Sequence, residues 1–250
     1  MSSYENFARV YDELMDDVPY EAWADQIQKL LEKYGISPGL MLELGCGTGR
    51  MMEMMGRKGY DMIGVDSSVE MLQIAREKVK PGDDSFLYLL QDMRSFELYG
   101  TVGAVISICD SINYITRKED LGEVFRLVNN YLDPGGVFVF DFNTDDKYRS
   151  IGDSIIAEDR EDVSFIWYND YDEENQMNYI DLSVFVREED GRYQKYTEEH
   201  IQRGYTLEEI RRLIEKSGLR FLGAYDGYSD REAREDSERI VVVAGEYGKR

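Results

Sequence analysis

The segment L-E-L-G-C-G-T-G at residues 42–49 carries the strongest structural signal in the chain. The apolar run of residues 40–44 predicts a buried strand, and the glycines at positions 45, 47 and 49 predict a tight turn after it. Glycine permits positive φ angles and lets a ligand approach the backbone closely. A helix is expected over the methionine-rich residues 51–55. We therefore expect a strand–turn–helix unit with a ligand site at the carboxyl end of the strand.

The strand–helix pattern repeats on the carboxyl side of this unit. Apolar runs predict further strands over residues 60–65, 85–90, 102–109 and 137–142. Helices are expected as well, and the spacing of a capping box occurs at Ser67 and Glu70, at Thr116 and Glu119, and at Thr206 and Glu209. Continuous apolar strands that alternate with helices are typical of a parallel sheet covered on both faces. We therefore expect an α/β protein with a doubly wound, mostly parallel sheet.

Three further regions complete the organisation of the chain. Residues 1–36 have apolar side chains at helical spacing and are expected to form an N-terminal helical cap. Residues 144–205 change to a period of two, with a hairpin signal at Asp190-Gly191, and are expected to form an inserted antiparallel β lobe. Residues 206–250 return to a helix and two strands. Together with residues 37–143 they are expected to form the main domain, with a seven-stranded sheet.

The composition is that of a globular chain with a large excess of acidic residues. Its 250 residues include 29 Lys and Arg against 51 Asp and Glu, which gives a formal charge of −22. This balance disfavours a nucleic-acid partner, which needs Lys and Arg to displace counterions, and an anionic membrane surface. Cys46 and Cys109 are too few for a disulfide framework. The first residues lack the features of a signal peptide, and no apolar run approaches the ~20 residues that span a bilayer, so a soluble, cytoplasmic protein is expected.

Two acidic residues beside the glycine turn sharpen its interpretation. Glu43 lies just before the first glycine, and Asp66 ends the next predicted strand. An acid at the end of the second strand can bind both hydroxyls of a ribose. The main rival is a nicotinamide-dinucleotide site, whose Gly-x-Gly-x-x-Gly pattern needs a third glycine where this chain has Arg50. The spacing therefore disfavours a dinucleotide.

With these features the chain resembles the class I S-adenosylmethionine-dependent methyltransferases. The glycine turn resembles the first motif of that family, and Asp66 resembles its ribose-binding acid. Three more segments follow in the family's order: L-Q-D-M-R at 90–94, I-C-D-S-I-N-Y at 108–114 and L-D-P-G-G-V-F-V-F at 132–140. The resemblance covers residues 39–143, with weaker correspondence at 206–245. It implies a Rossmann-like fold and S-adenosylmethionine as the cofactor.

The resemblance also implies which residues hold the cofactor. Glu43 orients the glycine turn, Asp66 binds the ribose, and residues 92–93 lie near the adenine. Cys109 and Asp110 fall where the fourth strand ends at the reacting centre. The candidate cofactor-binding residues are Glu43, Gly45, Cys46, Gly47, Gly49, Asp66, Ser67, Asp92, Met93, Cys109 and Asp110. No metal site is expected.

A closer resemblance is to small-molecule N-methyltransferases, including those that act on amino sugars, and to bacterial relatives of these. Such proteins share the antiparallel lobe and a Tyr-Asp pair near the N-terminus, here Tyr11 and Asp12. The implied reaction is methyl transfer to a small-molecule acceptor, at nitrogen rather than oxygen, by in-line attack that proximity and orientation promote. Tyr11 and Tyr114 are candidates for positioning an amine, and His200, the one histidine of the sequence, is a candidate base.

Alternatives from other classes stay open at this point. One is a cofactor-binding regulatory or interaction module without turnover, and another is an NAD-dependent oxidoreductase. Methylation of nucleic acid is disfavoured, because the chain has Cys109-Asp110-Ser111-Ile112 in place of an Asp/Asn-Pro-Pro-Tyr/Phe signature, and because Cys109 does not follow a proline. A monomer or a homodimer is expected, and the charged runs 158–162 and 231–239 are expected to be solvated.

Overall fold

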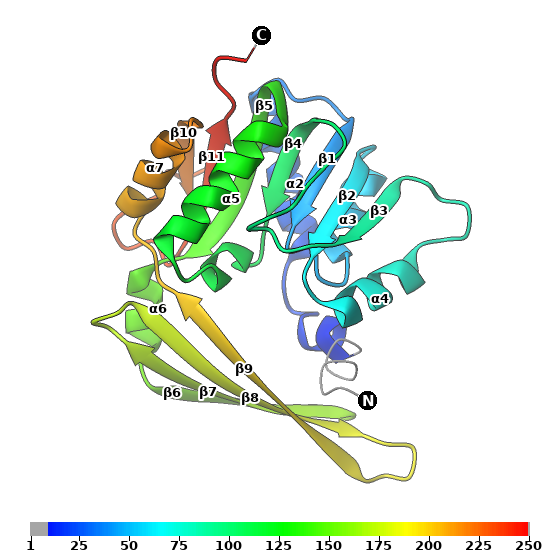
Figure 1. The fold of residues 1–250 in the computed structure, drawn as a ribbon. Helices are drawn as coiled ribbons and strands as arrows, with labels where there is room; N and C mark the ends of the chain where they lie inside the picture. The colour runs from blue at the N-terminus through cyan, green and yellow to red at the C-terminus, as the bar shows by residue number, and fades with distance from the viewer. Residues whose placement is uncertain (1–9, 250) are drawn as a thin grey trace.

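The computed structural model describes residues 10–249, and its main feature is a seven-stranded sheet between two layers of helices (Figure 1). The strands of this sheet are β1 (Leu40–Leu44), β2 (Asp61–Asp66), β3 (Phe86–Leu90), β4 (Val102–Ser107), β5 (Leu132–Asn143), β10 (Arg220–Asp226) and β11 (Arg239–Gly245). The helices are α2 (Tyr20–Lys33), α3 (Arg50–Arg57), α4 (Val69–Lys78), α5 (Lys118–Tyr131) and α7 (Leu207–Lys216), with a 3₁₀ turn, η1 (Ser111–Tyr114). Helices α2, α3 and α4 pack on one face of the sheet, and α5 and α7 pack on the other.

The strand order β10-β11-β5-β4-β1-β2-β3 places β1 and β4 side by side in the middle of the sheet. Strands β1 to β5 run parallel, whereas β11 pairs antiparallel with β5 and with β10. The order reverses between β1 and β4, and ligands of doubly wound sheets bind at such a switch point, beyond the carboxyl ends of the strands. The expected mostly parallel, doubly wound sheet of seven strands is confirmed.

Burial on both faces explains why these strands read as continuous apolar runs. In β1, Met41 packs with the layer of α2 and α3, whereas Leu42 and Leu44 pack with the layer of α5 and α7. In the second layer, Phe138 and Phe140 of β5 stack with ring centroids 4.6 Å apart. Because helices bury both faces of the sheet, the strand ends are held at fixed positions, as a ligand site requires.

A second, antiparallel sheet forms the inserted lobe and lies across the carboxyl ends of the large sheet (Figure 1). Its strands, in spatial order, are β6 (Ser154–Asp159), β7 (Val163–Asp172), β8 (Met177–Arg187) and β9 (Tyr193–Arg203). A short helix, α6 (Asp145–Ile151), precedes them and was not predicted. Its seven residues are too few to show a helical period, and it is fixed by the Thr144 side chain, which accepts a hydrogen bond from the Lys147 N–H.

The helix starts differ from the sequence expectations in two of three cases. Helix α4 begins after Ser68, whose side chain accepts from the Met71 N–H, one residue later than expected. Helix α5 begins after Arg117, which makes no side-chain cap, so the expected box at Thr116 and Glu119 is wrong. The box at Thr206 and Glu209 forms as predicted. A capping box needs an extended backbone at one specific residue, and spacing alone does not determine which residue that is.

The N-terminal segment contributes a helical turn over residues 10–14 and helix α2. Residues 1–9 of the expected helical cap lie outside the described residues. Val10 packs against Leu182 and Val184 of β8, so the N-terminal turn contacts the lobe directly. Among residues 10–249, no helix is long and apolar enough to cross a membrane.

Candidate active site

A cavity of about 450 Å³ lies at the carboxyl ends of β1, β2 and β4. One wall comes from the glycine turn after β1 and from the end of β2. A second wall comes from the segment after β4, and a third from the inner face of the lobe, including Trp167 and Leu182. Tyr11, on the N-terminal helical turn, closes part of the remaining side. The cavity is therefore built where the large sheet, the lobe and the N-terminal segment meet.

The glycine turn is hydrogen-bonded to β2, and its glycines have different roles. The N–H groups of Gly45 and Cys46 both donate to the Val65 carbonyl, at 2.8 and 3.1 Å. Gly45 and Gly47 have φ angles of 72° and 51°. A Cβ at Gly45 would lie 2.7 Å from the Ser111 Oγ, whereas a Cβ at Gly47 would meet no atom within 4 Å. Gly45 is therefore required for packing against η1, and Gly47 leaves open space in the cavity wall.

Gly49 does not lie in the cavity wall with the other two glycines. It is the N-cap of α3, with a φ of 75°. A Cβ there would lie 2.6 Å from the Tyr88 Oη and 3.3 Å from the Ala75 Cβ. Its role in this structure is to start α3 in a confined place beneath the turn.

Asp66 closes the turn from the end of β2. Its Oδ2 accepts the Gly47 N–H at 2.7 Å, and its Oδ1 accepts the Ser68 N–H at 2.8 Å. Burial raises the pKa of Asp66, and these backbone hydrogen bonds oppose that rise. Each carboxylate oxygen can accept a second hydrogen bond, so Asp66 retains acceptor capacity toward the cavity that it lines.

Glu43 is a buried acid behind the same turn. The residue is 2% exposed, and its Oε2 has no hydrogen-bond partner among the residues that the structure describes. Burial, and then the nearby Asp66 carboxylate, raise the pKa of Glu43 well above its usual range. A buried acid with an unsatisfied oxygen is costly, which is typical of a functional site rather than of a core.

The N-terminal turn is held over the glycine turn by polar contacts. The Thr48 Oγ1 donates to the Asp12 Oδ1 at 2.6 Å, and the Arg50 Nη1 donates to the Asp12 carbonyl at 3.1 Å. Tyr11 is thereby fixed at the cavity, where burial raises the pKa of its phenol well above the usual value. The two residues of the Tyr-Asp pair therefore have different contacts: Tyr11 lines the cavity, whereas Asp12 binds the glycine turn through Thr48.

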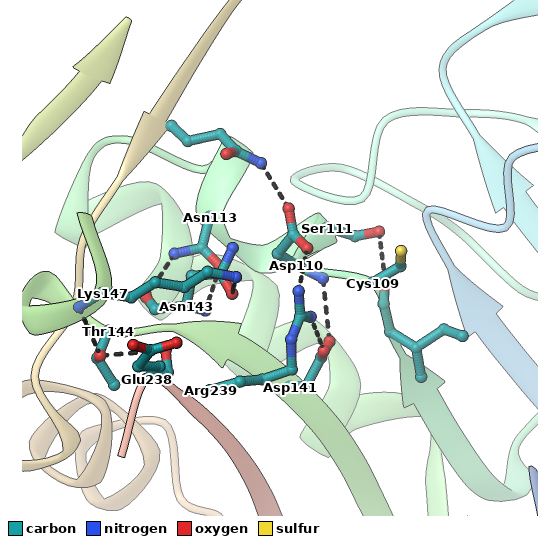
Figure 2. Close-up of polar contacts among 12 residues, drawn as sticks. Cys109, Asp110, Ser111, Asn113, Asp141, Asn143, Thr144, Lys147, Glu238 and Arg239 are labelled. Carbon is teal, nitrogen blue, oxygen red and sulfur yellow. Dashed lines mark hydrogen bonds and ion pairs between the residues drawn. The ribbon is translucent and has the colours of Figure 1, made fainter. Parts of the chain in front are cut away.

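The chain after β4 is strained and held by an ionic network (Figure 2). Cys109 and Asp110 both have left-handed backbones, with φ angles of 57° and 52°. Figure 2 shows Arg239 between Asp110 and Asp141: its Nη2 lies 2.8 Å from the Asp110 Oδ1, and its Nη1 pairs with Asp141. Left-handed non-glycine residues cost about 1–3 kcal/mol each and persist where the surroundings fix them. The expectation that the 231–239 run is solvated is wrong for Arg239, whose side chain is only 20% exposed.

Cys109 is a packing residue with an inert thiol. Burial raises the pKa of its thiol to about 12, and Asp110 and Asp141 act in the same direction. Its Sγ lies 3.8 Å from the Tyr20 Oη. Because the thiolate is the nucleophilic form, this thiol does not serve as a nucleophile at neutral pH.

Asn113 fixes the position of η1 relative to both sheets. Its Nδ2 donates to the carbonyls of Asn143 and Arg203, at 2.8 and 2.7 Å, and its Oδ1 accepts the Asn143 N–H at 2.9 Å. The next residue, Tyr114, is thereby held against the lobe.

Tyr114, His200 and Glu198 form a row of polar groups on the cavity wall. The Tyr114 Oη lies 3.3 Å from the His200 Nδ1, and the His200 Nε2 lies 3.4 Å from the Glu198 Oε2. Burial lowers the pKa of His200 below its usual 6.5, so its imidazole is neutral at pH 7. Burial, and then Glu70, raise the pKa of Glu198 to about 7. A neutral imidazole between a phenol and a carboxyl group can accept a proton and pass it on.

A smaller cavity of about 190 Å³ adjoins the first. Both are lined by Gly45, Asp66, Ser67, Met93 and Tyr114. Asp92 lines only the smaller of the two cavities. Its Oδ1 accepts a hydrogen bond from the Arg94 Nε at 2.9 Å, and this interaction lowers the pKa of Asp92. The two cavities together could hold the two ends of one elongated ligand.

The structure brings most of the predicted site residues to one wall. Those on the larger cavity are Tyr11, Glu43, Gly45, Cys46, Gly47, Asp66, Ser67, Met93, Cys109, Asp110, Tyr114 and His200. Sequence reasoning did not select Ser111, Trp167, Glu198 or Gln202, which line it as well. The period of two in β9 contained the signal for Glu198 and Gln202, because they share a face with His200. Within residues 10–249, no three His, Cys, Asp or Glu side chains are grouped so that they could hold a metal ion.

Comparison with known proteins gives consistent matches. The model of a methyltransferase domain matches residues 41–136. The chain is 34% identical over 243 residues to the putative methyltransferase YqeM of Bacillus subtilis (strain 168), and the alignment covers 96% of each chain. It is 30% identical to a crystal structure of a S-adenosylmethionine-dependent methyltransferase from Clostridium acetobutylicum ATCC 824, with a TM-score of 0.87 over 99% of this chain and 100% of that chain.

A third similarity covers about half of each chain. Over 120 residues, which are 48% of this chain and 49% of the relative, the sequence is 32% identical to the dTDP-3-amino-3,4,6-trideoxy-alpha-D-glucopyranose N,N-dimethyltransferase of Streptomyces venezuelae.

The cavity suits the cofactor named for the Clostridium structure. Gly47 leaves open space of the kind that a ligand needs to approach the backbone. Asp66 presents a carboxylate from the end of β2, the position at which doubly wound folds bind a ribose. The chain belongs to the class I S-adenosylmethionine-dependent methyltransferases, enzymes whose cofactor is S-adenosylmethionine.

Proposed function

We propose that this enzyme transfers a methyl group to the nitrogen of a small-molecule acceptor. The observation that carries the proposal is the row Tyr114–His200–Glu198, which lines the same cavity as the glycine turn and Asp66. A nitrogen acceptor must lose a proton to attack, and this row offers a neutral imidazole for it. The partial similarity to a Streptomyces venezuelae N,N-dimethyltransferase gives further support.

The cofactor would lie along the ends of β1 and β2. Asp66 would bind the ribose hydroxyls, and Gly45 and Gly47 would let the rest of the cofactor approach the backbone. Asp92 and Met93 would hold the adenine in the smaller cavity, which has room beside them. Among the other candidates, Glu43 and Gly49 would support the turn from behind, and Cys46, Ser67, Cys109 and Asp110 would complete the wall.

The chain's own groups would act by orientation, by exclusion of water and by proton transfer. Bound S-adenosylmethionine supplies an electrophilic methyl carbon, whose bond to sulfur breaks as the bond to nitrogen forms. Tyr11 and Tyr114 would position the amine, and the His200 Nε2 would accept its proton. The lobe and the N-terminal turn, which pack together in the cluster of Val10 and Leu182, would exclude water from the cavity. Most of the rate enhancement would then come from proximity and orientation.

An acceptor screen tests the proposal. The enzyme is incubated with S-adenosylmethionine and matched small amines and alcohols, and methylated products are identified by mass spectrometry. Methylation of amines, with no reaction of the matched alcohols, is expected. Methylation of alcohols alone would overturn the assignment to nitrogen, and cofactor binding without transfer to any acceptor would favour a regulatory module.

The wider setting follows from the same proposal. We expect a monomer or a homodimer that acts in the cytoplasm, where the two free cysteines stay reduced. We expect no nucleic-acid substrate, because the formal charge of −22 repels polyphosphate chains.

A further inference from the structure

We infer that the acceptor is an amine without a phosphate group, that it enters the cavity as an ammonium ion, and that the Glu198 carboxylate binds this ion. The inference rests on the methyl transfer to nitrogen proposed above. It adds the charge of the acceptor and the residue that selects it.

The position of Glu198 is the first observation. Glu198 lies on β9 opposite Leu182 of β8, which lies opposite Trp167 of β7, so the three side chains form one row across the lobe. All three line the cavity. The Glu198 side chain is 2% exposed, and neither of its carboxylate oxygens has a hydrogen-bond partner among the residues that the structure describes.

A buried acid beside Leu182, at the end of this row, is destabilising unless something compensates it. The His200 Nε2 lies 3.4 Å from the Glu198 Oε2, on a ring that is neutral at pH 7. Burial and the Glu70 carboxylate raise the pKa of Glu198 to about 7, so near neutral pH the group is poised between its two forms. A cation in the cavity would complete the missing hydrogen bonds and favour the carboxylate.

The other charges on the cavity wall point the same way. Besides Glu198, the wall carries Asp66, the buried acid Glu43 and Asp110, which is paired with Arg239, and Arg50 is the one Arg or Lys on this wall among the described residues. Arg50 is already engaged, because its Nη1 donates to two backbone carbonyls and its guanidinium lies 4.8 Å from the centre of the Tyr20 ring. Phosphate groups are normally held by free Arg and Lys donors. An acceptor linked to a nucleoside diphosphate, as in the name of the Streptomyces venezuelae relative, would meet carboxylates here instead.

Aromatic groups on the wall add attraction for a cation. Trp167, Tyr11 and Tyr114 line the cavity with Glu198. The face of an aromatic ring attracts an ammonium group by about 0.5–2 kcal/mol, depending on desolvation. A carboxylate with aromatic neighbours is the usual chemistry for binding an organic ammonium ion.

The same arrangement accounts for the proton. The bound ammonium gives one N–H proton to the Glu198–His200 pair, and its freed lone pair forms the bond to the methyl carbon. The bond from that carbon to sulfur breaks, and its electron pair stays on sulfur. The products are the N-methylated ammonium, S-adenosylhomocysteine and one proton, which the pair releases to solvent.

Matched ligand sets test this inference. Each set contains an amine, its hydroxyl analogue and its phosphorylated form: glucosamine, glucose and glucosamine 6-phosphate, and ethanolamine, ethylene glycol and phosphoethanolamine. Binding to the complex with S-adenosylhomocysteine is measured by calorimetry, and turnover is measured with S-adenosylmethionine. We expect at least one amine to bind at least 10-fold more tightly than its hydroxyl analogue and than its phosphorylated form.

Glu198→Gln should reduce the binding of that amine at least 10-fold, and Glu199→Gln is the matched control. Glu199 is the next residue of β9, is exposed and faces away from the cavity. Equal binding of amine and hydroxyl forms in both sets, including no binding of either, would overturn the inference, as would preference for the phosphorylated form. Unchanged amine binding in Glu198→Gln would overturn it as well.

The two forms of the cofactor separate the remaining explanations. S-adenosylmethionine carries a positive sulfonium, and S-adenosylhomocysteine does not. We expect Glu198→Gln to leave the affinities for both unchanged. A loss confined to S-adenosylmethionine would show that Glu198 pairs with the sulfonium and would overturn the inference. Binding of neither cofactor form to the wild type would instead contradict the proposed function itself.

Discussion

The Nη2 of Arg239, the first residue of β11, lies 2.8 Å from the Oδ1 of Asp110, which follows β4. The same guanidinium pairs with the buried Asp141 of β5. One side chain from the carboxyl-terminal part of the chain thus fixes the strained segment after β4. Burial lowers the pKa of Arg239, whereas the carboxylates of Asp141 and Asp110 raise it. The net pKa is raised, so the carboxylates have the larger effect.

Replacement of Arg239 should therefore be strongly destabilising. Arg239→Met leaves Asp110 and Asp141 without their cation, and breaking a buried pair in this way costs about 3–5 kcal/mol. Urea unfolding followed by circular dichroism measures the loss. Arg231→Met is the control, because Arg231 pairs with Asp226 on the surface, with its side chain 74% exposed, and should change stability by at most about 1 kcal/mol. Equal losses for the two variants would show that the buried network does not matter.

Three glycine-to-alanine variants should have three different outcomes. Gly47→Ala adds a methyl group that meets no protein atom within 4 Å but extends into the cavity, so it should fold and lose cofactor affinity. Gly45→Ala places a Cβ 2.7 Å from the Ser111 Oγ, so it should lose both stability and affinity. Gly191→Ala, at the hairpin tip with a φ of 81°, has the same kind of backbone strain without the site. Thermal unfolding and calorimetry with S-adenosylhomocysteine distinguish the three, and normal affinity in Gly47→Ala would contradict the assignment.

Glu198→Gln should change how stability depends on pH. The folded-state pKa of about 7 lies above the ordinary 4.5, so the folded protein holds this proton more tightly than the unfolded chain does. That contribution is full below pH 4.5 and is lost as the pH rises through about 7. The variant has no such loss, so its stability relative to the wild type should rise by about 1–3 kcal/mol between pH 5 and pH 8. Urea unfolding at both pH values tests this, and a constant difference would refute the burial of an ionisable Glu198.

His200→Gln should reduce turnover more than cofactor binding. The imidazole is the candidate base, and loss of a general base lowers the rate by about 10²–10⁴-fold. Because burial places the pKa of His200 below 6.5, its titration should limit the rate only under acidic conditions. In the wild type, protonation of Glu198 should already reduce kcat/KM below about pH 7. In Glu198→Gln only His200 remains to titrate, so the decline of kcat/KM toward acid should begin below pH 6.5. A rate that is unchanged in His200→Gln would remove this residue from the mechanism.

The parts of the site that were predicted from sequence are those fixed by local geometry. Gly45 and Gly47 need positive φ angles at a turn, and Asp66 is placed by its position at the end of a strand. Glu198 could be assigned to a face but not to a cavity, because its burial depends on how the lobe meets the sheet. Arg239 could not be found, because its partners are 129 and 98 residues away in the chain. Sequence shows that a residue is charged, but only the fold shows which charge faces it.

The central claim is that the cavity at the ends of β1 and β2 binds S-adenosylmethionine through Asp66. Calorimetric titration of S-adenosylhomocysteine into the wild type, Asp66→Ala and Asp61→Ala tests it most directly. Asp61 is the control, because it is exposed at the opposite end of β2. The account predicts one-to-one micromolar binding to the wild type and to Asp61→Ala, with a loss of about 10- to 100-fold in Asp66→Ala. No binding to the wild type, or equal affinity in all three proteins, would contradict the claim.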